Sequence, residues 1–186
     1  MTNATLELIA SRRSHRAYAP TPLTQQQLDA LLKAAVESPS AVNRQPWHFT
    51  VVRNQALLDE MNRAIWEQMM KRRPEMRSRR FEDSNFHVFY HAPTVIFISG
   101  MPVNSYTPID GGIAVENIAL AAESMGLGSV ILGMPREAFL GDQAEKFRKA
   151  LYFPEGWDFV IAIAVGTPAD TKPAHEVKED RISFVD

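Results

Sequence analysis

The chain has 186 residues, of which 45% are hydrophobic and 23% are charged, and its formal net charge is −2. This composition is typical of one folded domain and excludes a chain that is disordered over most of its length. The near balance of charge argues against a nucleic-acid-binding protein, and the absence of cysteine excludes disulfides, a thiolate nucleophile and metal centres held by cysteine.

The N-terminal residues predict a short helix over 4–11, led by Asn3, and no targeting signal. The arginines follow the apolar stretch, whereas a secretory signal peptide carries its positive charges first. No window approaches 18 apolar residues, so we expect no membrane span and a cytoplasmic protein.

A second helix is predicted over 24–37 by its N-terminal pattern. Thr24 and Gln27 form a capping box, and Leu23 and Leu28 form a hydrophobic staple around it. A short strand over 48–52 follows. A helix over 55–71 then places four apolar residues on one side: Leu58, Met61, Ile65 and Met69.

A β-branched run over 94–99 predicts a buried strand, and residues 107–125 predict an unusually apolar helix. Thr107 suits its N-cap, Pro108 its first position and Gly126 its end. Because almost no polar face remains, we expect this helix to be buried all round, with a second subunit covering what one chain leaves open.

Strands over 129–132 and 159–165 follow, with a helix over about 142–151 between them. The last twenty residues are polar and end in the apolar residues 182–185, which favours an arm that docks elsewhere, such as an edge strand on a partner. From periodicity alone, the alternation of helices and strands also permits a flavodoxin-like parallel sheet.

Three segments carry candidate chemistry, and the first lies where the first helix ends. Arg12, Arg13, Ser14 and Arg16 supply three guanidinium groups and a hydroxyl, which suit a phosphate group. The alternative is a solvated charge cluster at the surface.

The second segment is the loop over 38–47, which is rich in small and amide side chains. Its small residues permit close approach of a flat ligand, and Asn43 and Gln45 can pair with polar ring edges. An ordinary helix-to-strand loop explains the same composition.

The third segment contains Gly126, Gly128 and Gly133. It is not a dinucleotide fingerprint, because these glycines follow a helix and precede a strand, the reverse of the Rossmann order. Gly133, at the end of an apolar strand, can still offer its backbone N–H to a ligand.

Other signals are weaker. His87 and His91 are four residues apart, but no third ligand has the expected spacing, so we expect no metal. Residues 71–80 are strongly basic, and we interpret them as a solvated helix. Four aromatic residues follow and either cover a flat substrate or simply pack: Phe81, Phe86, Phe89 and Tyr90.

Taken together, these motifs resemble the nitroreductase family of flavin enzymes. The resemblance rests on the Arg-Arg-Ser-x-Arg run at 12–16, the Pro-Ser…Asn-x-Gln-Pro-Trp loop at 39–47, the helix end at 121–129 and a Val-Gly-x-Pro turn at 165–168. It implies an α+β fold with a mostly antiparallel sheet flanked by helices, as an intertwined homodimer. The whole chain, 1–186, would form one such domain, with a variable lid over about 66–90 and a C-terminal arm, 167–186, on the partner subunit.

The resemblance also implies the positions that hold FMN. The phosphate and polar ring groups would meet Arg12, Arg13, Ser14 and Arg16. Residues Pro39, Ser40, Ala41 and Asn43 would line the flavin of the neighbouring subunit, and Leu132, Gly133 and Met134 would face the ring, with the Gly133 N–H at N5. Lys178 is the preferred basic residue of the arm for the phosphate, with His175 and Arg181 as alternatives.

The implied activity is that of an NAD(P)H-dependent oxidoreductase. Tightly bound FMN would accept hydride from NADH or NADPH and then reduce a small electron-poor acceptor, such as a nitroaromatic or a quinone, in a ping-pong reaction. No catalytic side chain is required, because the flavin carries the chemistry. The alternative is a flavin-binding protein with little turnover.

Overall fold

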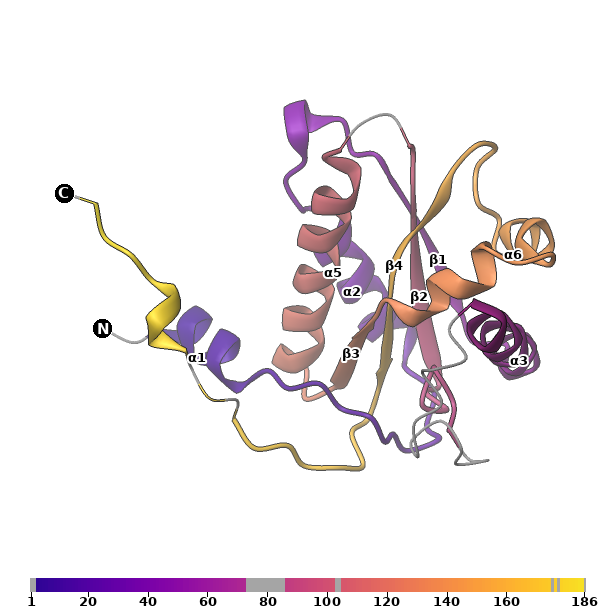
Figure 1. The fold of residues 1–186 in the computed structure, drawn as a ribbon. Helices are drawn as coiled ribbons and strands as arrows, with labels where there is room; N and C mark the ends of the chain where they lie inside the picture. The colour runs from indigo at the N-terminus through magenta and orange to yellow at the C-terminus, as the bar shows by residue number, and fades with distance from the viewer. Residues whose placement is uncertain (1–2, 73–85, 103–104, 175, 177, 186) are drawn as a thin grey trace.

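A four-stranded sheet forms the centre of the computed structural model, which describes residues 3–72, 86–102, 105–174, 176 and 178–185 (Figure 1). Its strands are β1 (Trp47–Val52), β2 (Thr94–Gly100), β3 (Gly128–Leu132) and β4 (Asp158–Gly166), in the order β1-β2-β4-β3. Each neighbouring pair is antiparallel. The expected α+β class is therefore confirmed, and the flavodoxin-like parallel sheet is excluded.

The helices follow the predicted ranges closely. They are α1 (Ala4–Ser11), α2 (Gln25–Val36), α3 (Gln55–Arg72), α5 (Thr107–Ser124) and α6 (Ala144–Ala150), with 3₁₀ turns η1 (Ala41–Asn43), η3 (Met134–Phe139) and η4 (Glu179–Arg181). Asn3 caps α1 by accepting a hydrogen bond from the Leu6 N–H. Both halves of the predicted capping box are present at the start of α2.

The sheet separates two apolar layers (Figure 1). Alternate residues of β2 point to opposite faces, so Ile96 and Ile98 pack with α2 and α5, whereas Val95 and Phe97 pack with α3, η3 and α6. Because both faces are covered, every residue of β2 is buried. This burial explains why the strand reads as a continuous apolar run.

Helix α5 differs from its prediction at one end and on one side. Thr107 is not the N-cap: its hydroxyl donates to the Met101 carbonyl, and Tyr106 precedes the helix without a side-chain cap. Ile109 and Ile113 are 56% and 36% exposed, so one chain leaves a face of the helix uncovered. The C-terminal end agrees with the prediction, because Gly126 has a φ of 69° and closes the helix.

The C-terminal segment begins by pairing with its own chain. The Ala19 N–H donates to the Thr167 carbonyl, and the Ala169 N–H donates to the Ala17 carbonyl. Beyond this pairing the described residues are largely exposed, and Figure 1 shows the C-terminus beyond α1, on the same side as the N-terminus. The first residues of the predicted arm, 167–186, therefore pair with their own chain, and docking of the arm on a partner stays a prediction.

Several predictions fall wholly or partly outside the described residues. Residues 73–85 contain most of the basic segment, Phe81 and the middle of the expected lid, and His175 is also outside. Across the described ranges, no helix combines the length and the apolar character that crossing a bilayer needs.

Candidate functional site

Arg16 and the end of β3 line one pocket, as the flavin resemblance requires. The pocket is lined by Arg16 and by Leu132, Gly133 and Met134. Its remaining walls are Val130 and Ile131 of β3 and the aromatic segment after the expected lid, with Phe86, Val88 and Tyr90. The Arg16 guanidinium lies 6.0 Å from the centre of the Tyr90 ring.

This pocket is small and partly open. Its volume is about 170 Å³, whereas sites for cofactors and similar ligands usually measure about 300–1,000 Å³. The described residues of one chain therefore form only part of the wall that a ligand of cofactor size needs.

Gly133 gives the pocket an open polar edge. A Cβ built on this residue meets no atom within 4 Å, so the space beside its backbone is free. The backbone hydrogen bonds outside the helices and strands of the described chain include none that Gly133 donates. An N–H in this position can donate to a flat ligand at the pocket.

The other residues of the predicted phosphate cluster point in different directions. Arg12 forms an ion pair with Glu116 of α5, with Nε and Oε1 3.3 Å apart. Arg13 folds back onto the end of α1 and donates to the Ala10 and Arg12 carbonyls. Ser14 lies beside Ser129 at the start of β3 through an isolated bridge. Only Arg16 among these four reaches the pocket in the described chain.

The predicted loop over 39–43 lies at the other end of α5. The Ala41 N–H donates to the buried Asp110 carboxylate in the first turn of that helix, at 3.1 Å. An 18-residue helix is about 27 Å long, and the chain after α1 passes its opposite end (Figure 1). In one chain, Pro39, Ser40, Ala41 and Asn43 are thus remote from Arg16.

This loop also stores backbone strain. Val42, Asn43 and Gln45 have φ values of 47°, 54° and 49°, in the left-handed region that β-branched residues strongly disfavour. Val42 is also 83% exposed, although it is apolar. A strained loop with an exposed apolar tip is typical of a segment that is shaped for a ligand or a partner.

Lys178 and Arg181 are exposed on the C-terminal segment. Arg181 pairs with its neighbour Asp180, at 3.6 Å. No contact within the described residues of one chain brings either side chain to the pocket. Their role at a phosphate stays a prediction.

Asp170 is a residue of this region that the sequence analysis did not identify. Its carboxylate accepts hydrogen bonds from His15 Nδ1 at 2.7 Å and from the Arg16 N–H at 3.1 Å. It comes 155 residues after His15, so no local motif could indicate the contact.

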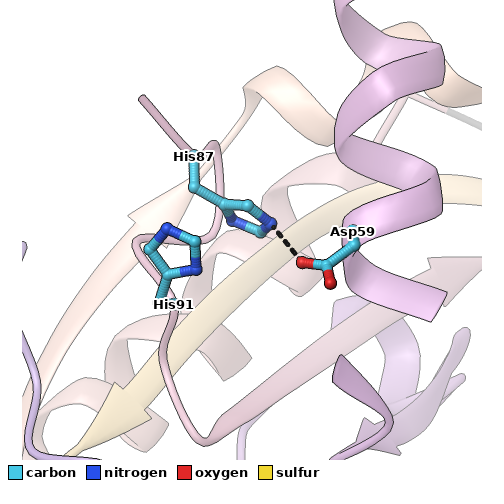
Figure 2. A group of neighbouring side chains, drawn as sticks. All are labelled: Asp59, His87 and His91. Carbon is cyan, nitrogen blue, oxygen red and sulfur yellow. Dashed lines mark hydrogen bonds and ion pairs between the residues drawn. The ribbon is translucent and has the colours of Figure 1, made fainter. Parts of the chain in front are cut away.

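A second cluster joins α3 to the turn before β2 (Figure 2). Asp59, His87 and His91 place one potential metal-ligand atom each within 4.8 Å of one another. The third ligand that the sequence spacing lacked is therefore supplied by a different element, α3. His87 is buried and lies 3.1 Å from Asp59 Oδ1 through its Nε2 atom.

The hydrogen bonds of His87 favour a structural role over a metal site. The Phe89 N–H donates to His87 Nδ1 at 3.2 Å, so the proton of the neutral ring lies on Nε2 and is donated to Asp59. A metal ion at Nε2 would place the proton on Nδ1, against the Phe89 N–H. The two hydrogen bonds that link Phe89, His87 and Asp59 instead hold the turn that carries Tyr90 and Phe86.

Replacing His87 by alanine should destabilise the protein by about 2–3 kcal/mol at pH 7.5, through lost packing and two lost hydrogen bonds. Burial lowers the pKa of His87 below its ordinary value of 6.5, His91 adds to this, and Asp59 opposes it. Below pH 6.5 the unfolded chain therefore binds more protons at this position, and the stabilisation falls as the pH falls. Thermal unfolding should show a smaller cost of His87→Ala at pH 5.5 than at pH 7.5. His48→Ala is the control for the loss of a histidine at another position. An equal cost of His87→Ala at pH 5.5 and pH 7.5 would contradict the structural role that we assign to the buried His87 ring.

A larger concavity, of about 710 Å³, lies elsewhere, between α6 and the start of β4. None of the predicted site residues lines it. Its Arg148 is bound to Asp158 at 3.0 Å and to the Phe139 carbonyl at 3.1 Å. The predicted residues Arg16, Leu132, Gly133 and Met134 line the smaller pocket instead, and their role there stays a prediction.

Comparisons with known proteins agree with the fold and with the motifs. The chain is 33% identical over 185 residues to a protein of Archaeoglobus fulgidus whose provisional name is NADH dehydrogenase/NAD(P)H nitroreductase, covering 96% of this chain and 92% of that one. It is similar to the FMN-bound nitroreductase of Desulfitobacterium hafniense, with 34% identity, full coverage of both chains and a TM-score of 0.94. An FMN-bound nitroreductase of Bacteroides fragilis is 29% identical, with full coverage of both chains and a TM-score of 0.91. Since the sequence model of the Nitroreductase family also matches residues 9–167, this chain belongs to the nitroreductase family.

Proposed function

We propose that this protein is an FMN-dependent oxidoreductase that uses NADH or NADPH to reduce small electron-poor acceptors such as nitroaromatics or quinones. The observation that carries the proposal is the pocket that Arg16 lines together with Leu132, Gly133 and Met134. These residues come from two separate motifs of the sequence, and the fold brings them to the same place. The names of the relatives, which include FMN-bound nitroreductases, support the same function.

The residues present fit a flat ring with an anionic tail. Val130 and Leu132 give the lining of the pocket apolar residues, and Tyr90 adds an aromatic ring. Arg16 supplies a permanent positive charge with several donors. The open edge at Gly133 leaves room for a ring to approach the backbone N–H.

FMN, when bound, supplies the redox chemistry of the site. The chain binds and orients it and shapes the charge around it. The Arg16 guanidinium favours an anionic group beside it in the pocket, and the Gly133 N–H can donate a hydrogen bond to the ring. In this proposal the donor and the acceptor would bind in turn at the same face of the flavin, which is the basis of the ping-pong reaction.

A homodimer completes the site in this proposal. The pocket of one chain is too small for a cofactor, and the loop over 39–43 lies about one helix length away. Helix α5 exposes Ile109 and Ile113, and α1, which packs beside it, exposes Leu6 and Ile9. A second copy that covers these apolar residues can bring its own strained loop to the first copy's pocket.

The competing proposal is a flavin-binding protein with little turnover. Purified protein should be yellow and should release FMN when it is denatured. NADH or NADPH oxidation with nitrofurazone or menadione as acceptor should then be rapid. Bound FMN without oxidation by any acceptor would support the alternative, and a colourless protein that FMN does not reconstitute would contradict both.

A further inference from the structure

We propose that Asp170 is a positioning residue of the flavin site, which acts by fixing the backbone at His15 and Arg16 so that the Arg16 side chain enters the pocket. This inference rests on the proposed function, because it assigns a task to a residue behind the same site.

The carboxylate of Asp170 joins three groups. Its Oδ1 atom lies 2.7 Å from His15 Nδ1. Its Oδ2 atom accepts from the Arg16 N–H at 3.1 Å and pairs with the Lys172 ammonium at 3.1 Å. Two of the three contacts are therefore made to consecutive residues of the arginine motif, one through a side chain and one through the backbone.

These contacts keep the Asp170 carboxyl group in its charged form. Burial disfavours its charged form, but hydrogen bonds from His15, the Arg16 N–H and Lys172 outweigh that effect and lower the pKa of Asp170 to about 2. The carboxylate is thus ionised at neutral pH and acts only as an acceptor, which places the His15 proton on Nδ1.

His15 is held on its other sides as well. The backbone N–H of His15 donates to the Ser129 carbonyl at 2.9 Å, and the backbone carbonyl of His15 accepts from the Tyr18 hydroxyl at 2.7 Å. Burial raises the pKa of Tyr18 well above its ordinary value, and the charge of Asp170 adds to this, so the hydroxyl stays a donor. A Cβ on Gly128 would lie 2.9 Å from His15 Cγ, so only glycine leaves room for the ring there.

The consequence concerns Arg16, the next residue. Its side chain is exposed, and a free arginine loses much rotamer entropy when it binds a ligand. Because Asp170 fixes the backbone N–H of Arg16, the backbone from which the Arg16 side chain extends is held in one position at the pocket that Leu132–Met134 also line. The anchor therefore lowers the cost of ordering Arg16 around FMN.

The test is the affinity of the apoprotein for FMN, measured by flavin fluorescence. Asp170→Ala should weaken binding about tenfold, which is the size expected for the loss of hydrogen bonds to a charged group. Asp170→Asn keeps one oxygen for the Arg16 N–H and should weaken binding less, by about threefold. Lys172→Met is the matched control and should change the affinity less than twofold, because the ion pair that it removes is partly exposed.

A double-mutant cycle separates positioning from a general loss of structure. In an Arg16→Met background, Asp170→Ala should weaken FMN binding less than twofold, because the residue through which Asp170 acts is already absent. A purely structural role predicts the same tenfold loss in both backgrounds, and that result would overturn the inference, as would full affinity of Asp170→Ala. Failure of the wild-type protein to bind FMN would instead contradict the proposed function.

Discussion

Replacing Arg16 by methionine is expected to weaken FMN binding by about a hundredfold, and NAD(P)H oxidation should fall with it at limiting flavin. The reason is that charge-assisted hydrogen bonds contribute about 1.5–3 kcal/mol each. Arg16 is the residue of the arginine motif that lines the pocket. Fluorescence titration of the apoprotein measures the affinity, and thermal unfolding checks the fold.

The melting temperature of Arg16→Met should change little. The side chain is exposed, and its contacts with the described residues include a 3.4 Å hydrogen bond to the Ser14 carbonyl and the approach to Tyr90. Arg53→Met removes another exposed arginine, one that does not line the pocket, and should leave FMN affinity unchanged. Equal affinities of Arg16→Met and the wild type would refute the placement of FMN beside this residue.

Introducing a charge on the exposed side of α5, by Ile113→Glu, should produce monomers that have lost most of their FMN. Ile113 is 36% exposed in the single chain, so the substitution costs the isolated fold little. In the proposed homodimer, the same carboxylate would be buried in an apolar interface without a partner, at a cost of several kcal/mol. Light scattering after size-exclusion chromatography measures the mass, and flavin absorbance measures the bound cofactor.

Leu140→Glu is the control for this prediction. Leu140 is also apolar and 42% exposed, but it follows η3, on the sheet face opposite α5. It should leave both the mass and the FMN content unchanged. A stable Ile113→Glu dimer with full flavin content would show that this face of α5 is not the subunit interface.

The placement of most helices and strands was predictable because it depends on short-range chemistry. Thr24 and Gln27 cap α2 by bonds between residues three apart, and the left-handed Gly126 ends α5 in the same local way. The exception is Thr107, whose hydroxyl bonds to Met101 across a turn instead of capping the helix. At this position a contact outside the helix replaced the expected local one.

The candidate site was predictable only in part. Arg16 and Gly133 were identified as separate motifs, and the resemblance to a flavin family joined them. Spacing alone gave no sign of Asp59 beside His87, because the carboxylate comes from a helix 28 residues earlier. The strain at Val42 was equally hidden, since valine rarely adopts a positive φ and no composition rule predicts that it will.

By itself, the sequence determined the elements, the apolar character of β2 and α5, and the residue types that suit a flavin. Those properties follow from periodicity and side-chain chemistry, which act within a few residues. The tertiary structure confirmed the antiparallel sheet, which the resemblance implied and periodicity alone left open, and it decided that Arg16 meets the end of β3 and that Asp170 reaches back to His15. These contacts join residues far apart in the chain, and only the packing of both layers against the sheet brings such residues together.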